Sequence, residues 1–172
     1  MSIEGHAAGG PAVEVRDALP AEYEAAGKIV AEAFYADGQL DAPDSGFYAD
    51  VLRDVASRAD SAEILVALDD GVVVGAVTFV PHGGPMADIA QDGEAEIRML
   101  GVAPDAQGRG AGTALMRECI ARSAGTWRIV LSTQTVAHGS HRLYERLGFV
   151  REPARDWVPV PGVDLLCYVL EL

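Results

Sequence analysis

The residues best suited to bind a ligand form a glycine-rich run at 107–112, with the sequence QGRGAG. The run lies between an apolar stretch that ends at Val102 and a segment with helical spacing, so it forms the entry to a helix. The first N–H groups of a helix have no internal partner and carry the positive end of the helix dipole. Three glycines let an anion approach these groups closely, and Arg109 adds a positive charge. The run is therefore predicted to bind a diphosphate.

Spacing excludes two other kinds of phosphate-binding loop. A nucleoside-triphosphate loop requires a lysine directly after its last glycine, and no lysine follows these glycines. A dinucleotide fingerprint that starts at Gly108 and Gly110 requires a third glycine where Thr113 stands. The remaining alternative is a tight turn that binds nothing.

Strands and helices alternate around the glycine-rich run. Patterns of apolar and β-branched residues predict strands at 13–16, 63–68, 72–80, 94–102, 127–133 and 164–171, with Phe149 entering the sheet again. Helical spacing predicts a helix that opens at 19–22 and further helices at 46–59, 110–124 and 138–147. A hairpin turn is expected at 69–71 and a loop at 157–162. Hairpins in the middle and alternation in the second half predict a mixed α/β (α+β) sheet.

The composition is that of a folded globular protein. The 172 residues, of which 49% are hydrophobic and 23% charged, predict a flexible tail at 1–11 and a single domain over 12–172. A net charge of −13 argues against a nucleic-acid partner. No apolar run approaches the roughly 20 residues that span a bilayer, and the start of the chain lacks the features of a signal peptide. We therefore expect no membrane association and a cytoplasmic location.

Two motifs in order resemble the GNAT superfamily of N-acyltransferases. The first is the pattern Gln107-x-x-Gly110-x-Gly112, which follows the strand sequence EIRMLGV at 96–102 and the turn APD at 103–105. The second is LYERLGF at 143–149, which is similar to the closing helix and strand of that family. The resemblance extends over 13–172. It implies a mixed, mostly antiparallel central sheet of about six to seven strands, flanked by about four helices.

The resemblance also implies a cofactor, acetyl-CoA, and residues that hold it. Backbone groups of the strand would bind the pantetheine arm where the strand splays or bulges, and amides of the glycine-rich run would bind the pyrophosphate. The residues carried over for cofactor binding are Leu100, Val102, Gln107, Gly108, Arg109, Gly110, Ala111, Gly112 and Thr113. An acetyl group would then pass directly to a primary amine, without a metal or a covalent intermediate.

Two residues are predicted to carry protons. The resemblance implies that Tyr144 is the general acid for the leaving thiolate. The helix is compatible with this role, because Leu143 and Leu147 point to the core and leave the Tyr144 hydroxyl free at the edge of the apolar stripe. The alternative is a boundary tyrosine whose hydroxyl bonds water or backbone. Glu96 is the candidate base, since the family uses a glutamate at this place in the strand in some members. Strand alternation is expected to put the Glu96 side chain on the same face of the sheet as that of Leu100. The alternatives are a solvated carboxylate paired with Arg98, and a water relay as the base.

Several other residues remain open between a structural and a functional role. His138 and His141 are further proton acceptors or surface residues, and Trp157 either lines the acceptor pocket or anchors its loop. Acidic residues precede the second helix, where the family's acceptor often enters; they are Asp37, Asp41 and Asp44. Together with the net charge they either steer a cationic acceptor or merely solvate the surface.

The sequence identifies neither the acceptor nor the length of the acyl group. We expect an amine on a small molecule or a peptide and leave a homodimer open. The alternative functions are an acyl-CoA-binding sensor without turnover and an acyltransferase for longer acyl groups. Cys119 and Cys167 have no spacing that suggests chemistry.

Overall fold

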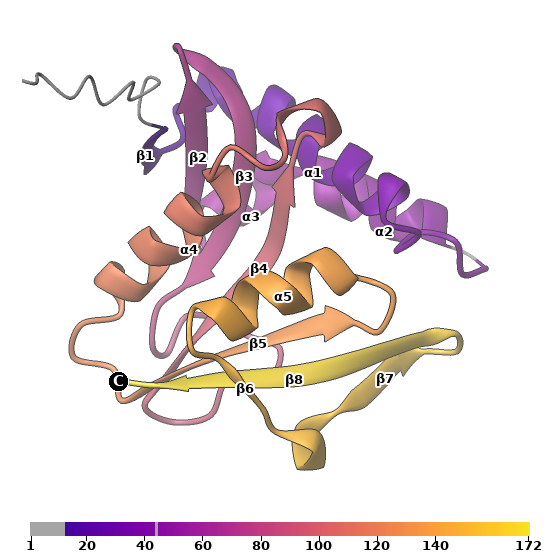
Figure 1. Ribbon diagram of the computed structural model, residues 1–172, viewed down its shortest axis with the longest axis vertical. Coiled ribbons are helices and arrows are strands. Elements are labelled where there is room, and N and C mark those ends of the chain that lie inside the picture. Colours follow the sequence, from indigo (N-terminus) through magenta and orange to yellow (C-terminus); the bar gives the residue numbers. More distant parts are fainter. Residues whose placement is uncertain (1–12, 44) are drawn as a thin grey trace, which may run out of the picture.

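The computed structural model describes residues 13–43 and 45–172 (Figure 1), so the predicted tail at 1–11 lies outside the described residues. The strands are β1 (Glu14–Asp17), β2 (Glu63–Asp69), β3 (Val72–Val80), β4 (Glu94–Val102), β5 (Arg128–Gln134), β6 (Val150–Arg151), β7 (Trp157–Val160) and β8 (Val163–Glu171). The α-helices are α1 (Tyr23–Ala36), α2 (Ser45–Arg53), α3 (Val55–Ala59), α4 (Ala111–Arg122) and α5 (His138–Arg146). Within this part of the chain, no helix has the length and apolarity needed to cross a membrane.

One mixed sheet runs through the described residues in the order β1-β2-β3-β4-β5-β8-β6, and β7 pairs with β8. All strand pairs are antiparallel except β4 and β5, which are parallel. Helices α1, α2 and α3 cover one face, and α4 and α5 cover the other (Figure 1). The sheet therefore separates two cores, one on each face.

The sheet opens in its middle, between β4 and β5. These strands pair from Glu94 with Arg128 as far as Ile97 with Leu131, and β5 continues along β8 alone. On its other side β4 carries a bulge, since Met99 and Leu100 lie opposite the single residue Val77. Met99 has a φ of 56°, a left-handed backbone conformation that residues other than glycine rarely adopt. Beyond Ile97, β4 and β5 therefore diverge.

The bulge corrects one prediction about side-chain direction. Regular alternation would place Leu100 on the same face as Glu96. Instead, the extra residue shifts the pattern, so Met99 packs in the core beside α1 whereas Leu100 packs beside α4 and α5. Glu96 and Leu100 thus belong to opposite faces of the sheet.

The architecture confirms the predicted fold class, with eight strands and five helices in the described residues. The predicted helix at 46–59 is divided, because Asp54 leaves helical backbone angles and its Oδ1 accepts from the Ser57 amide at 3.2 Å. The predicted loop at 157–162 contains β7, which gains backbone partners on β8. The division into a tail and one domain over 12–172 stays a prediction.

Close packing of α1 against α2 depends on Gly27. A Cβ atom there would overlap the backbone carbonyl of Arg53, whereas a Cβ atom at Gly46 in α2 would meet nothing within 4 Å. We expect Gly27→Ala to lower the free energy of unfolding by about 1–3 kcal/mol through overpacking. The control Gly46→Ala should raise it by about 0.4–1 kcal/mol by restricting the unfolded chain. Urea denaturation measures both, and equal effects would contradict the close approach.

Candidate active site

The glycine-rich run enters α4 as predicted, with its backbone exposed. Gly108 and Gly110 have φ values of 80° and 86°, and a Cβ atom on either would meet nothing within 4 Å. The first helical bond of α4 runs from the Ala114 amide to the Gly110 carbonyl at 2.9 Å, so the amides of residues 111–113 have no helical acceptor. The N-terminus of α4 thus presents free donors beside glycines that leave room for an anion.

A groove of about 220 Å³, here called the loop groove, lies along this run. Predicted cofactor residues that line it are Leu100, Val102, Gln107, Gly108, Gly110, Ala111, Gly112 and Thr113. Arg109 does not line it, because its Nη1 lies 3.3 Å from Asp69 Oδ2 and the side chain is 64% exposed. Ser140 and Arg146 of α5 also line the groove, and sequence reasoning missed them. Their spacing of six residues on one helix gave no local sign of this.

Tyr144 lines a second, smaller space of about 80 Å³, the central cavity, at the divergence of β4 and β5. The tyrosine is buried, whereas its neighbours Leu143 and Leu147 are only partly buried, so the prediction that it lies at the edge of the apolar stripe is wrong. Its ring centroid lies 6.0 Å from those of Phe149 and Tyr168. Burial raises the pKa of Tyr144 to about 12 and outweighs its hydrogen bond with Ser140. The phenol therefore stays protonated at neutral pH.

Glu96 lines the central cavity from the other face of the sheet. Its Oε1 accepts from the amides of Ile89 and Ala90, both at 2.8 Å, and its Oε2 accepts from the Asp88 amide at 3.0 Å. The side chain is 2% exposed, and Arg98 Nε lies 3.9 Å from Oε2. Burial raises the pKa of Glu96, although the three amides oppose that rise. Glu96 is thus not the solvated carboxylate of the alternative interpretation.

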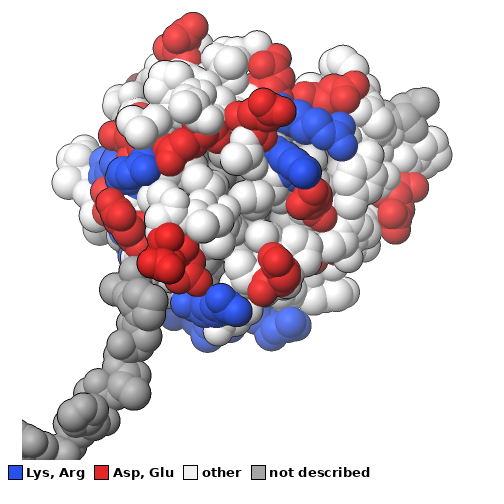
Figure 2. All heavy atoms as spheres, turned by 90° about the horizontal axis from the view of Figure 1, so that it is seen from above, with Lys and Arg blue, Asp and Glu red and all other residues white. Residues whose placement is uncertain are grey.

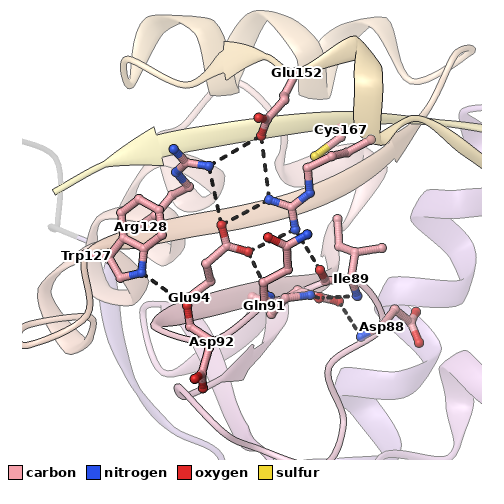
Figure 3. A network of polar contacts seen from close by, with 12 residues as sticks. Asp88, Ile89, Gln91, Asp92, Glu94, Trp127, Arg128, Glu152 and Cys167 are labelled. Atoms are coloured by element: carbon pink, nitrogen blue, oxygen red, sulfur yellow. Dashed lines mark hydrogen bonds and ion pairs between the residues drawn. The ribbon is translucent and has the colours of Figure 1, made fainter.

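A second buried carboxylate, Glu94, holds the same loop between β3 and β4. Its two oxygens lie 2.9 and 3.0 Å from Arg155, and the Gln91 amide donates to Oε1 at 2.9 Å. Figure 3 shows Arg128 and Glu152 beside Glu94 in this network. Burial by itself would raise the pKa of Glu94, but the hydrogen bonds from Arg155 and Gln91 lower it. Glu94 lines none of the cavities described here and has a structural role.

The third space, the apolar cavity, has about 640 Å³ and lies between α2 and the β7–β8 hairpin. Trp157 lines it and also anchors the hairpin, because its Nε1 donates to Ser132 Oγ at 3.1 Å. The central cavity adjoins the loop groove through the shared residues Leu100 and Ser140. It adjoins the apolar cavity through the shared residues Gln39, Tyr48, Asp88, Arg98, Gln134 and Leu165. The three spaces therefore follow one another, with Tyr144 and Glu96 at the middle one.

The remaining candidates lie elsewhere. Neither His138 nor His141 lines any of the three spaces, and the ring Nε2 of His141 lies 2.8 Å from the Gln134 carbonyl. Asp37 lines the loop groove, and burial raises its pKa. Asp41 lines none of them, and Asp44 lies outside the described residues. On the face in Figure 2, acidic side chains form separate groups, some beside lysines or arginines, rather than one patch.

Comparison with known proteins agrees with this geometry. A "Mycothiol acetyltransferase" from Cellulomonas flavigena is 38% identical over 96 residues, which are 54% of this chain and 28% of that relative. A structure described as a GNAT-family acetyltransferase from Desulfovibrio desulfuricans has a TM-score of 0.70 and 25% identity over 93% of this chain and 99% of its own. The PaiA N-acetyltransferase of Thermoplasma acidophilum, solved with coenzyme A, has a TM-score of 0.69 at 16% identity over 94% of this chain and 99% of its own.

The family model described as "Acetyltransferase (GNAT) family" matches residues 23–149, from the start of α1 to the residue before β6. This stretch contains the glycine-rich run, the divergence of β4 and β5, and Tyr144. A match over this much of the chain shows that the protein belongs to the GNAT family of acetyltransferases, enzymes that use acetyl-CoA.

Proposed function

We propose that the protein is an N-acetyltransferase that transfers the acetyl group of acetyl-CoA to a primary amine by direct attack. The observation that carries this proposal is the order of the three spaces, with the glycine-rich entry to α4 at one end and the buried side chains of Glu96 and Tyr144 in the middle. The small volume of the central cavity favours a short acyl group. The chain covers 28% of the mycothiol acetyltransferase, so the acceptor of that relative is not carried over.

Residues of the loop groove would hold the cofactor mainly by backbone. The free amides of Ala111, Gly112 and Thr113 suit a pyrophosphate, and the strand edge at Leu100 and Val102 is unpaired on the β5 side. When bound, acetyl-CoA supplies the thioester that the amine attacks. Release of free thiol with acetyl-CoA and a panel of amines tests turnover; binding of acetyl-CoA without thiol release would indicate a sensor.

Glu96 and Tyr144 would move the two protons of the reaction. The Oε2 atom of Glu96 accepts one amide where Oε1 accepts two, so Oε2 has the lone pair to receive a proton from the amine, directly or through a water. The Tyr144 hydroxyl would donate to the leaving thiolate. A phenol with a pKa of about 12 is a weak acid, but a thiolate in the same buried cavity also becomes more basic.

The loop is tested by placing a charge at Gly110. We expect Gly110→Asp to abolish coenzyme A binding, because the carboxylate would face the pyrophosphate. The control Gly110→Asn imposes the same backbone strain at a φ of 86° without the charge, and should retain measurable binding. Isothermal titration calorimetry on folded variants decides. Unchanged affinity in Gly110→Asp would show that the loop is not the cofactor site.

The base is tested by Glu96→Gln, which should lower kcat by at least about 10²-fold at unchanged acetyl-CoA affinity. Because the pKa of Glu96 is raised, the acid limb of the wild-type pH–rate profile should lie above the ordinary carboxyl pKa of about 4.3. The variant should lose that limb. Stability should change with pH in the opposite direction to activity. Because the pKa of Glu96 is raised in the folded state, Glu96 contributes stability at low pH, and this contribution is lost as the pH rises through the folded-state pKa.

Glu94→Gln is the matched control for the base. The substitution removes the charge of a buried carboxylate on β4 that, like Glu96, holds the loop between β3 and β4. Unlike Glu96, this carboxylate does not line the central cavity. We expect a lower melting temperature, with kcat within about threefold of wild type. If Glu94→Gln lowers kcat as much as Glu96→Gln, loop position explains both effects and Glu96 is not the base.

The acid is tested by Tyr144→Phe, which should lower kcat by at least about tenfold with little change in acetyl-CoA affinity. The control Tyr168→Phe removes a hydroxyl from the adjacent ring, where it donates to Glu145 Oε1 at 3.0 Å outside the cavity. That variant should keep the wild-type kcat. Wild-type turnover in folded Tyr144→Phe, with chemistry shown to be rate-limiting, would leave water as the proton donor.

A further inference from the structure

The apolar cavity has walls that core packing does not explain. Phe47 of α2 is 79% exposed and Val160 of β7 is 52% exposed, and both line this cavity. Large apolar side chains left exposed around a hollow mark a binding surface. Its volume of about 640 Å³ lies in the range of small-molecule pockets. The main apolar walls are Phe47, Tyr48, Trp157, Pro159, Val160 and Leu165.

The two charged side chains among the described residues that line this cavity form an ion pair with each other. Asp88 is the acidic side chain there and Arg98 the basic one, and Arg98 Nη2 lies 2.8 Å from Asp88 Oδ2. Arg98 Nη1 also donates to the Met86 carbonyl at 2.7 Å. The guanidinium is thereby occupied and offers little to a carboxylate on a ligand, and the Asp88 carboxylate is occupied in the same way. Burying a second charge of a ligand here would cost free energy without a new partner.

From this we infer, resting on the proposed N-acetyltransferase function, that the acceptor is an arylalkylamine: one primary amine on an apolar, ring-sized body without a carboxylate. A buried aromatic ring contributes roughly 150–250 Å² of contact, which the walls of Phe47, Trp157 and Val160 can cover. An apolar setting also lowers the pKa of the amine, which favours the neutral form that attacks. The net charge of −13 still favours the approach of a monocation over that of an anion.

A matched set of acceptors tests the chemistry. 2-Phenylethylamine has the ring and one amine, phenylalanine adds a carboxylate, and spermidine replaces the ring with further ammonium groups. With saturating acetyl-CoA, kcat/KM for 2-phenylethylamine should exceed that for either of the others by at least about tenfold. A higher kcat/KM for phenylalanine or spermidine would overturn the inference and leave the acetyltransferase function intact.

A pair of valines on β7 tests the place. Val160 lines the cavity, whereas Val158 on the same strand is similarly exposed, at 56%, and does not line it. Val160→Asp should raise the KM for 2-phenylethylamine by at least about tenfold and leave the KM for acetyl-CoA unchanged, because an unpaired carboxylate would enter an apolar wall. Val158→Asp should change neither by more than about twofold. Equal effects of the two substitutions, or no effect of Val160→Asp, would overturn the inference.

Calorimetry separates the two possible failures. A wild-type protein that binds no acetyl-CoA would remove the proposed function and the acceptor inference together. Binding of acetyl-CoA without acetylation of 2-phenylethylamine leads to a second titration, of the amine into protein saturated with coenzyme A. Saturable heat there, reduced in Val160→Asp but not in Val158→Asp, supports the acceptor class. The absence of such heat would overturn the inference alone.

Discussion

A β-sheet keeps its two faces apart, and this constraint governs where the protein can assemble a reaction site. Side chains from opposite faces reach one space only where neighbouring strands stop pairing. Here β4 and β5 diverge after Ile97 and Leu131, and the central cavity lies at that divergence. Glu96 enters it from the α1 side and Tyr144 from the α5 side. The bulge at Met99 contributes because it shifts the alternation along β4.

Two buried carboxylates on β4 show how environment gives one residue type two roles. Glu94 has Arg155 and Arg128 as ionic partners, and its pKa is lowered. Glu96 has three backbone amides and a more distant arginine, and its pKa is raised. Both hold the loop between β3 and β4, and the desolvation of each charge is offset by hydrogen bonds. Of these two carboxylates, only Glu96, whose pKa is raised, lies at a cavity, which is the combination that the proposed role as a base needs.

Features that depend on neighbouring residues could be predicted from the sequence. The hairpin at 69–71 forms with Asp70 and Gly71 at positive φ, and Gly148 has a φ of 95° after α5. The glycine-rich run enters α4 for the same local reasons. Features set by distant residues could not be predicted. The bulge depends on pairing with Val77, the burial of Glu96 depends on a loop that folds back over it, and Arg109 turns toward Asp69, 40 positions earlier. Strand β7 forms because β8 supplies its backbone partners.

The order of the three spaces has a consequence for the kinetic scheme. The loop groove and the apolar cavity share no lining residue among those described, and each adjoins the central cavity separately. In the proposed function acetyl-CoA occupies the loop groove and the amine occupies the apolar cavity, so neither has to leave before the other binds, and both are present when the acetyl group moves. Initial-rate plots against either substrate would then intersect, as in a sequential ternary-complex scheme, rather than run parallel as in a ping-pong scheme. Under the proposed function, the divergence of two strands thus sets the form of the rate law as well as the position of the site.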